Sequence, residues 1–207
     1  YDNNSNQTKI GNLIRTYDNL DRILTQTRDN LTVEYTYNDN EKTLQIKDPK
    51  GNITKEVYDK ANRLQKVINS NHTTEYEYNV DGSLKAQKNP TNIIKYTYNT
   101  DKSLQSIVTE KNDGQVIDKY TYTYDNNNNI LKENNKSYTY DSLNRLNTVT
   151  QNGKKVTYTY DNSGNISEKT EEDEEKIIST KNTYNEKNQL ISTKIKQNDV
   201  LSNSYSY

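Results

Sequence analysis

The chain has 207 residues, of which 29% are hydrophobic, and its 28 Lys and Arg nearly balance its 29 Asp and Glu. The formal net charge of −1 excludes the basic field that holds nucleic acid or an anionic membrane. No apolar run is long enough for a membrane span, and the lack of cysteine excludes disulfides and thiolate metal sites. Its 19 tyrosines are the only aromatic residues, and their regular spacing indicates a folded chain rather than a disordered one.

A tyrosine followed by Asp or Asn recurs along the whole chain, at intervals of 16 to 26 residues. We call these tyrosines the anchors, and they divide the chain into about ten repeat units. Because Tyr1 and Tyr207 occupy the same point of a unit, we expect the chain to be a fragment of a longer protein. The anchors predicted to hold the repeats together are Tyr17, Tyr37, Tyr58, Tyr78, Tyr98, Tyr124, Tyr140, Tyr160 and Tyr184.

Each unit predicts a β-hairpin. A second tyrosine often lies two residues before the anchor, which puts both rings on one face of a strand. The Asp or Asn after the anchor can bond the backbone two residues on and end that strand. The fourth position after the anchor is usually Gly, Asn or Asp, which indicates a positive φ. The sixth is Leu or Ile and begins the return strand, except that the unit at Tyr37 has one extra residue and reaches Leu44.

A second turn then leads to the next anchor, as at Asn152-Gly153 and Asp113-Gly114, which are strong hairpin signals. Residues 1–207 are therefore predicted to form a single array with an all-β fold, a repetitive antiparallel hairpin ribbon that coils into a spiral or partial shell. An isolated hairpin is marginal in water, so stability must come from neighbouring units. Unpaired edge strands at the ends of the array predict some self-association.

The segments Tyr58-Asp59-Lys60-Ala61-Asn62-Arg63-Leu64 and Tyr140-Asp141-Ser142-Leu143-Asn144-Arg145-Leu146 resemble the YD-repeat, or RHS-repeat, family. Copies of this pattern recur in phase along nearly the whole chain. They are similar to the repeats of RHS and wall-associated bacterial proteins, insecticidal toxin-complex shell subunits and teneurins. The resemblance implies a β-ribbon that spirals into a hollow shell, which in the bacterial toxins encloses a toxin. It also implies a secreted or cell-surface bacterial protein, and the family has been linked to carbohydrate binding at cell surfaces.

The leading hypothesis is a non-catalytic scaffold, a shell segment whose partners are the rest of the parent polypeptide and an enclosed toxin. The alternative is a module that binds surface glycans by stacking sugars on tyrosine rings. An enzyme is the least favoured class, since no catalytic, metal or cofactor-binding residue and no cofactor is predicted. The lone histidine, His72, fits an exposed turn, and the acidic run 171–175 fits a solvated hairpin tip. The tyrosines considered for glycan stacking are Tyr35, Tyr76, Tyr96, Tyr122, Tyr138 and Tyr158.

Overall fold

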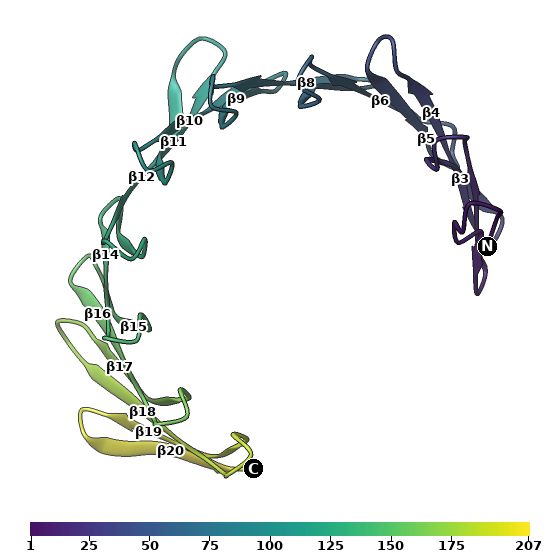
Figure 1. The fold of residues 1–207 in the computed structure, drawn as a ribbon. Coiled ribbons are helices and arrows are strands. Elements are labelled where there is room, and N and C mark those ends of the chain that lie inside the picture. The colour runs from purple at the N-terminus through teal and green to yellow at the C-terminus, as the bar shows by residue number, and fades with distance from the viewer. The chain divides into compact units, whose positions relative to one another are not determined.

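The computed structural model describes residues 1–207 and consists of β-strands and the turns between them (Figure 1). The expected all-β class is confirmed. No helix in the structure has the length and hydrophobicity that a membrane crossing requires. Two compact units make up the chain, and each is described by itself: unit 1 holds residues 1–97 and 108–119, and unit 2 holds residues 98–107 and 120–207.

Unit 1 is an antiparallel sheet in which each strand pairs with the next strand of the chain, from β1 to β10. Strands β10 (Asn92–Tyr98), β11 (Leu104–Lys111) and β12 (Val116–Tyr124) contribute residues to both units. The other strands of unit 1 are β1 (Lys9–Ile10), β2 (Leu13–Tyr17), β3 (Ile23–Arg28), β4 (Leu31–Asn38), β5 (Thr43–Lys47), β6 (Ile53–Tyr58), β7 (Leu64–Asn69), β8 (His72–Tyr78) and β9 (Leu84–Lys88).

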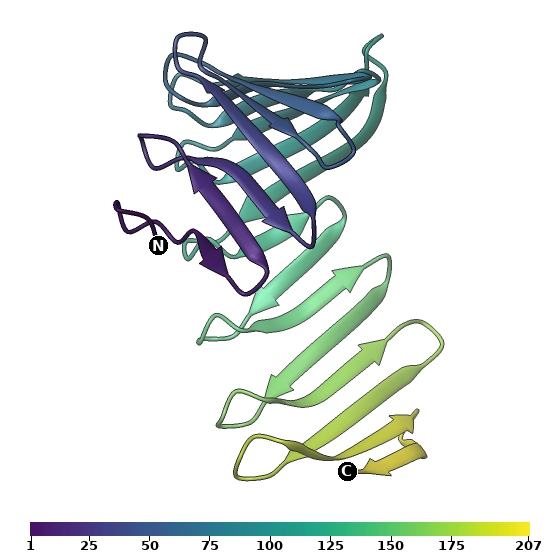
Figure 2. The same ribbon diagram turned by 90° about the vertical axis from the view of Figure 1, so that its right-hand side faces the viewer.

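Unit 2 repeats the same meander from β12 to β20, and its successive hairpins are seen in Figure 2. At the two ends of the array, β20 pairs with β19 and β1 pairs with β2. Self-association through the outer edges of β1 and β20 stays a prediction. The remaining strands of unit 2 are β13 (Ile130–Glu133), β14 (Lys136–Tyr140), β15 (Leu146–Gln151), β16 (Lys154–Tyr160), β17 (Ile166–Glu172), β18 (Ile177–Tyr184), β19 (Leu190–Gln197) and β20 (Val200–Ser206).

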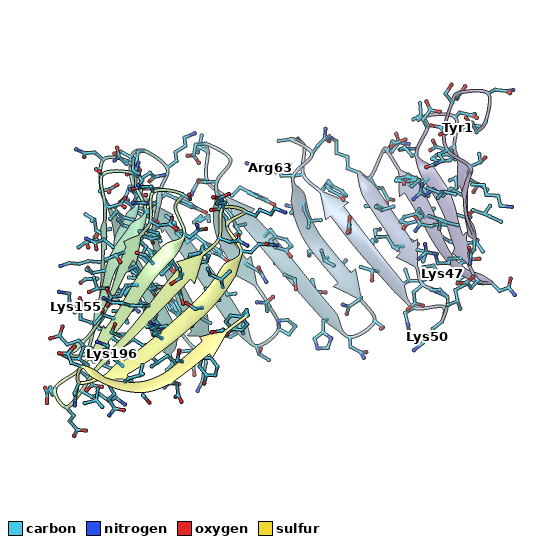
Figure 3. All side chains as sticks on the ribbon, turned by 90° about the horizontal axis from the view of Figure 1, so that it is seen from below. Tyr1, Lys47, Lys50, Arg63, Lys155 and Lys196 are labelled. Carbon is cyan, nitrogen blue, oxygen red and sulfur yellow. The ribbon has the colours of Figure 1, made fainter.

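The predicted hairpin boundaries are confirmed. The anchors end their strands and the Leu or Ile six residues later begins the return strand, except in the unit at Tyr37. There β4 continues to Asn38 and β5 begins at Thr43, one residue before the expected Leu44. The two kinds of turn lie at opposite edges of the sheet. In unit 1, Arg63 belongs to an anchor turn at one edge, while Lys47 and Lys50 lie at the other (Figure 3). The second turns include Asn152-Gly153, which joins β15 to β16 as expected.

A β-bulge marks most anchors. Tyr58 pairs with Leu64, and the register shifts between Val57 and Tyr58. The residue four positions after the anchor has the predicted positive φ, because the chain must turn back sharply there. Even the exception, Lys102, adopts a φ of 70°. The other such residues are Asp21, Asn62, Gly82, Asn128, Asn144, Gly164 and Asn188.

The extra residue in the unit at Tyr37 removes the bulge. Tyr37 pairs with Leu44 and Asn38 with Thr43 without a register shift, and Lys42 takes the positive φ of 50°. On its other side Leu44 pairs with Glu56 in a regular ladder. This pairing changes the hydrogen bond of the next anchor, Tyr58.

Each unit is a single-layered sheet. Leu13 and Ala86 are the only buried hydrophobic residues, and side chains stand on both faces with no second layer of strands (Figure 3). The accessible surface is 14564 Å², whereas a compact monomer of this mass exposes roughly 10,000 Å². One face, here called the tyrosine face, carries both rings of each Tyr-x-Tyr strand. The opposite threonine face carries Thr36, Thr139 and Thr159, which are exposed.

Candidate functional site

The anchor tyrosines connect each repeat to the one before it. The hydroxyl of Tyr78 donates a 2.6 Å hydrogen bond to the backbone carbonyl of Leu64, six residues after the preceding anchor. Tyr160 donates in the same way to Leu146, at 2.7 Å. The anchor is therefore a junction between repeats as well as part of a strand. Equivalent bonds join Tyr37 to Ile23, Tyr124 to Leu104, Tyr140 to Ile130 and Tyr184 to Ile166, and Tyr17 donates to Gln7.

The accepting carbonyl is available because its residue lies outside the ladder on that side. Leu64 pairs with Tyr58, but the ladder to the following strand starts only at Lys66. After Leu146 the corresponding ladder starts at Thr148. Backbone carbonyls in partly buried positions need a hydrogen-bond partner. The tyrosine hydroxyl thus takes the place of a backbone donor at a carbonyl that lies outside the ladder to the following strand.

Tyr58 departs from this pattern for the same reason. It follows the unit without a bulge, in which Leu44 is paired with Glu56 in the regular ladder. The Tyr58 hydroxyl donates instead to the Glu56 carboxylate at 2.5 Å, and this bond raises the pKa of Tyr58 to about 12. A groove of about 430 Å³ lies at this irregular junction, between the anchors Tyr37 and Tyr58.

The aspartate after the anchor closes the turn. Asp59 Oδ1 accepts the backbone N–H groups of Ala61 and Arg63, at 2.8 and 2.9 Å, and Oδ2 accepts Nε of Arg63 at 2.8 Å. The N–H of Arg63 is the main cause that lowers the pKa of Asp59, because it bonds to the ionised form. Asp18 and Asp141 bind an arginine in the same way, whereas Asp125 and Asp161 bind an asparagine.

Arginine in this turn also reaches the next repeat. The guanidinium of Arg63 lies 4.5 Å from the ring centroid of Tyr78, the following anchor. Arg22 over Tyr37 and Arg145 over Tyr160 repeat the contact at 4.2 and 4.3 Å. Exposed cation–π contacts contribute about 0.5–1 kcal/mol. Sequence reasoning missed this role, although Arg stands five residues after each of the preceding anchors, Tyr17, Tyr58 and Tyr140.

The residue with positive φ links neighbouring turns. Asn144 Oδ1 accepts hydrogen bonds from the side-chain amides of Asn127 and Asn129 in the preceding turn, at 2.9 and 3.1 Å. Asn188 accepts one from Asn165 at 3.0 Å. Glycine adopts the same φ more easily but has no oxygen to offer. The frequent replacement of glycine by asparagine therefore adds a bond between repeats.

The tyrosines considered for glycan stacking are all half-buried on the tyrosine face. The more exposed tyrosines are instead Tyr1, Tyr120, Tyr205 and Tyr207. A stacking role for the half-buried rings stays a prediction, because each presents only part of its surface to solvent. Their positions are Tyr35 in β4, Tyr76 in β8, Tyr96 in β10, Tyr122 in β12, Tyr138 in β14 and Tyr158 in β16.

Two of these rings share a groove of about 640 Å³ in unit 2, where Tyr138 and Tyr158 come from neighbouring repeats. Tyr138 lies opposite Val149 in the register, and Val149 lies opposite Val156. These valines line the groove between the two rings. The structure thus brings together one pair of the predicted stacking residues over an aliphatic floor.

The remaining candidate residues form no reactive cluster. His72 is exposed and begins β8, so it lies one residue beyond the turn in which the sequence placed it. The acidic run 171–175 spans the end of β17 and an exposed hairpin tip, where Asp173 accepts the N–H groups of Glu175 and Lys176. No group of three or more His, Cys, Asp or Glu side chains is arranged to hold a metal ion.

Removing one anchor hydroxyl tests the junction. Tyr78→Phe keeps the ring but leaves the Leu64 carbonyl without its donor, so the free energy of unfolding should fall by about 1 kcal/mol. Urea unfolding followed by circular dichroism measures the change. Tyr205→Phe is the matched control, because Tyr205 is 49% exposed. Equal stability of the two variants would contradict the assignment.

Acid should weaken the aspartate turns. The folded-state pKa values of Asp18, Asp59 and Asp141 lie below the ordinary value, because each carboxylate accepts backbone and arginine donors. Their stabilisation is complete above the unfolded-state pKa and is lost as the pH falls through the folded-state pKa. The unfolding free energy should therefore be flat from about pH 7 to 5 and fall below about pH 4. Denaturant titrations at each pH measure it.

The variant Asp59→Asn should flatten that decline, because it removes one carboxylate that acid would otherwise protonate. Glu174→Gln removes a carboxylate from the exposed tip and serves as control, with the native pH profile expected. A profile that is identical for both variants and for the native chain would show that the turn carboxylates do not control acid stability.

The comparisons with known proteins agree with this geometry. The RHS Repeat family model matches residues 140–175, and no curated protein sequence matches the chain. A crystal structure of TcdB2-TccC3 matches with a TM-score of 0.62 at 17% identity, over 86% of this chain and 14% of that one. A crystal structure of TcdB2-TccC3-TEV matches with a TM-score of 0.57 at 19% identity, over 92% of this chain and 11% of that one.

At these identities the structural similarity establishes the fold alone, and the chain spans only a small part of the solved proteins it matches. The family model covers a segment with two anchors, Tyr140 and Tyr160, and their aspartates. The resemblance to the RHS-repeat family is thereby confirmed: residues 140–175 match the RHS Repeat family model, in a chain that has the fold of part of TcdB2-TccC3.

Proposed function

We propose that the chain is a non-catalytic segment of a β-shell that encloses or presents a toxin or effector in a secreted or cell-surface bacterial protein. The observation that supports this most is the single-layered meander of RHS-repeat hairpins with the fold of part of TcdB2-TccC3. A sheet with two open faces and almost no core suits a wall better than a globular domain. The parent polypeptide and the enclosed effector are the partners.

The junction chemistry suits a wall that must stay closed without a core. Each repeat is joined to the next by strand pairing, an anchor hydroxyl and bonds between turns, as at Tyr160 and Asn144. All of these contacts lie within the layer, so neither face needs a second layer of protein. A substance on one face is then separated from the other by a continuous hydrogen-bonded sheet.

The proposal assigns no chemical step to this chain. The recurring carboxylates of the anchor turns, such as Asp59 and Asp141, are occupied with backbone N–H groups and arginine. Such carboxylates hold the turn and are not free to exchange protons with a substrate near neutral pH. Their regular recurrence follows from turn closure alone.

Protease protection in the polypeptide that carries this chain tests enclosure. If the repeats wall off an effector, protease should cleave the effector slowly in the native protein and at least tenfold faster after Tyr140→Ala with Tyr160→Ala, which removes two junctions. Lys155→Gln with Lys194→Gln, on the threonine face, should leave protection unchanged. An effector segment cleaved at the same rate in all three proteins would contradict enclosure.

We propose glycan binding as a second function, favoured by the groove between Tyr138 and Tyr158. Its aliphatic floor and two aromatic sides match the apolar face of a sugar ring, and Gln151 and Asn152 supply amides at the groove. The bound residue would be a saccharide unit of a cell-surface glycan. The other four candidate tyrosines are not needed for this site.

Tyr138→Ala with Tyr158→Ala should weaken binding to a glycan array by about tenfold or more, because each ring supplies about 0.5–1.5 kcal/mol beyond area burial. Tyr120→Ala removes a ring that is 39% exposed and serves as control. Saturable binding by the native chain that persists in the double variant would exclude this groove, and absence of binding by the native chain would exclude the function.

A further inference from the structure

The tyrosine face of strands β2, β3 and β4 carries two arginines and no carboxylate. Arg15 pairs with Gln26, and Gln26 pairs with Val33, so these side chains share one face. Leu13 pairs with Arg28 in the same ladder, two residues from the Arg15 pair, and therefore lies on that face as well. We call Arg15, Arg28 and the apolar residues Leu13, Val33 and their neighbour Leu31 the basic patch.

Arg15 is the unusual member of this patch. Its Nε is the one buried side-chain polar atom of the structure that has no hydrogen-bond partner. The arginines of the anchor turns, Arg22, Arg63 and Arg145, each bond to an aspartate. A buried donor without a partner is uncommon in folded proteins and indicates a missing water, ion or binding partner. Arg28 is exposed beside it.

No carboxylate of these strands can reach the patch. Glu34 is the only acidic residue of β2, β3 and β4, and it pairs with Thr25 on the threonine face. Its carboxylate is held there by Lys47 at 3.1 Å. Asp29 follows Arg28 in the turn, but its Oδ1 accepts a hydrogen bond from Asn12 at 2.8 Å and no ion pair joins it to either arginine. The patch therefore carries an excess of positive charge that is complementary to a negatively charged ligand.

The spacing of the two arginines and the apolar residues beside them indicate which kind of ligand the patch binds. Guanidinium groups bind carboxylates through two parallel hydrogen bonds. Arg15 and Arg28 are diagonal neighbours on adjacent strands, about 7–8 Å apart at the backbone. In an extended peptide, side chains two residues apart point to one side and are separated by about 7 Å. The apolar residues beside the arginines match the non-polar parts of a polypeptide.

We propose that the basic patch binds an extended acidic polypeptide segment, with carboxylates two residues apart paired to Arg15 and Arg28. The segment lies on the tyrosine face and supplies the partner that the Arg15 guanidinium lacks. This inference rests on the charge and register of unit 1, and it holds whether or not the repeats form a shell.

Fluorescence anisotropy with a labelled eight-residue peptide of alternating Glu and Thr tests the proposal. The native chain should bind it saturably and should bind the corresponding Gln-Thr peptide at least tenfold more weakly. Arg15→Gln with Arg28→Gln should lose at least tenfold in affinity, and Arg15→Lys should fall in between, because lysine keeps the charge but not the paired hydrogen bonds.

The matched control is Lys155→Gln with Lys194→Gln, which removes the same charge from unit 2, where Lys155 is labelled in Figure 3. This variant should bind the acidic peptide like the native chain. Circular dichroism tests whether each variant has kept its sheet. If Arg15→Gln unfolds the edge of unit 1, the single variant Arg28→Gln replaces the double variant.

Four outcomes overturn the proposal. One is equal affinity for the Glu-Thr and Gln-Thr peptides, and another is native affinity in the folded arginine variants. The third is an anionic oligosaccharide of equal charge that binds tighter than the peptide and loses that binding in the arginine variants. Concentration-dependent association of the native chain that disappears in the arginine variants would assign the patch to a second copy and also count against it.

Discussion

This fold depends on one requirement: the backbone carbonyl at the start of each bulged return strand lies outside the ladder to the following strand and needs a hydrogen-bond donor. A single-layered sheet cannot hide such a group in a core, so a donor must come from within the layer. The hydroxyl of the next anchor supplies it, as Tyr78 does for Leu64 at 2.6 Å. The anchor turn keeps nearly the same length in every repeat, and the sheet register returns a tyrosine to this carbonyl even though the anchors are 16 to 26 residues apart. Where one extra residue removes the bulge, Tyr58 turns to Glu56 instead.

The turn residues serve two purposes each, and this explains the composition of the chain. Asp59 closes its own turn and orients Arg63, which then covers the ring of Tyr78. Asn144 adopts the positive φ of 58° that a glycine could supply and also accepts amides from the preceding turn. A sheet stabilised this way needs few hydrophobic residues, because hydrogen bonds and ring contacts along its edge join the repeats.

The two faces of the sheet differ in chemistry, and this difference bears on function. The threonine face of unit 1 carries paired charges such as Lys66 with Glu75 and Lys47 with Glu34, which satisfy one another. The tyrosine face carries rings, aliphatic residues and the unpaired Arg15. Such asymmetry suits the wall proposed above, and on the tyrosine face of unit 1 the buried Nε of Arg15 still lacks a hydrogen-bond partner.

Hairpin boundaries, positive-φ positions and the closing role of aspartate could all be read from the sequence, because they depend on residues within about six positions of one another. Repetition made the reading secure, since Leu64, Leu146 and their equivalents begin return strands at the same offset. The hydroxyl-to-carbonyl junction, the arginine over the next ring and the groove between Tyr138 and Tyr158 could not be read in this way. They join residues 10 to 20 positions apart, and whether such residues meet depends on strand register and on the bulges that shift it.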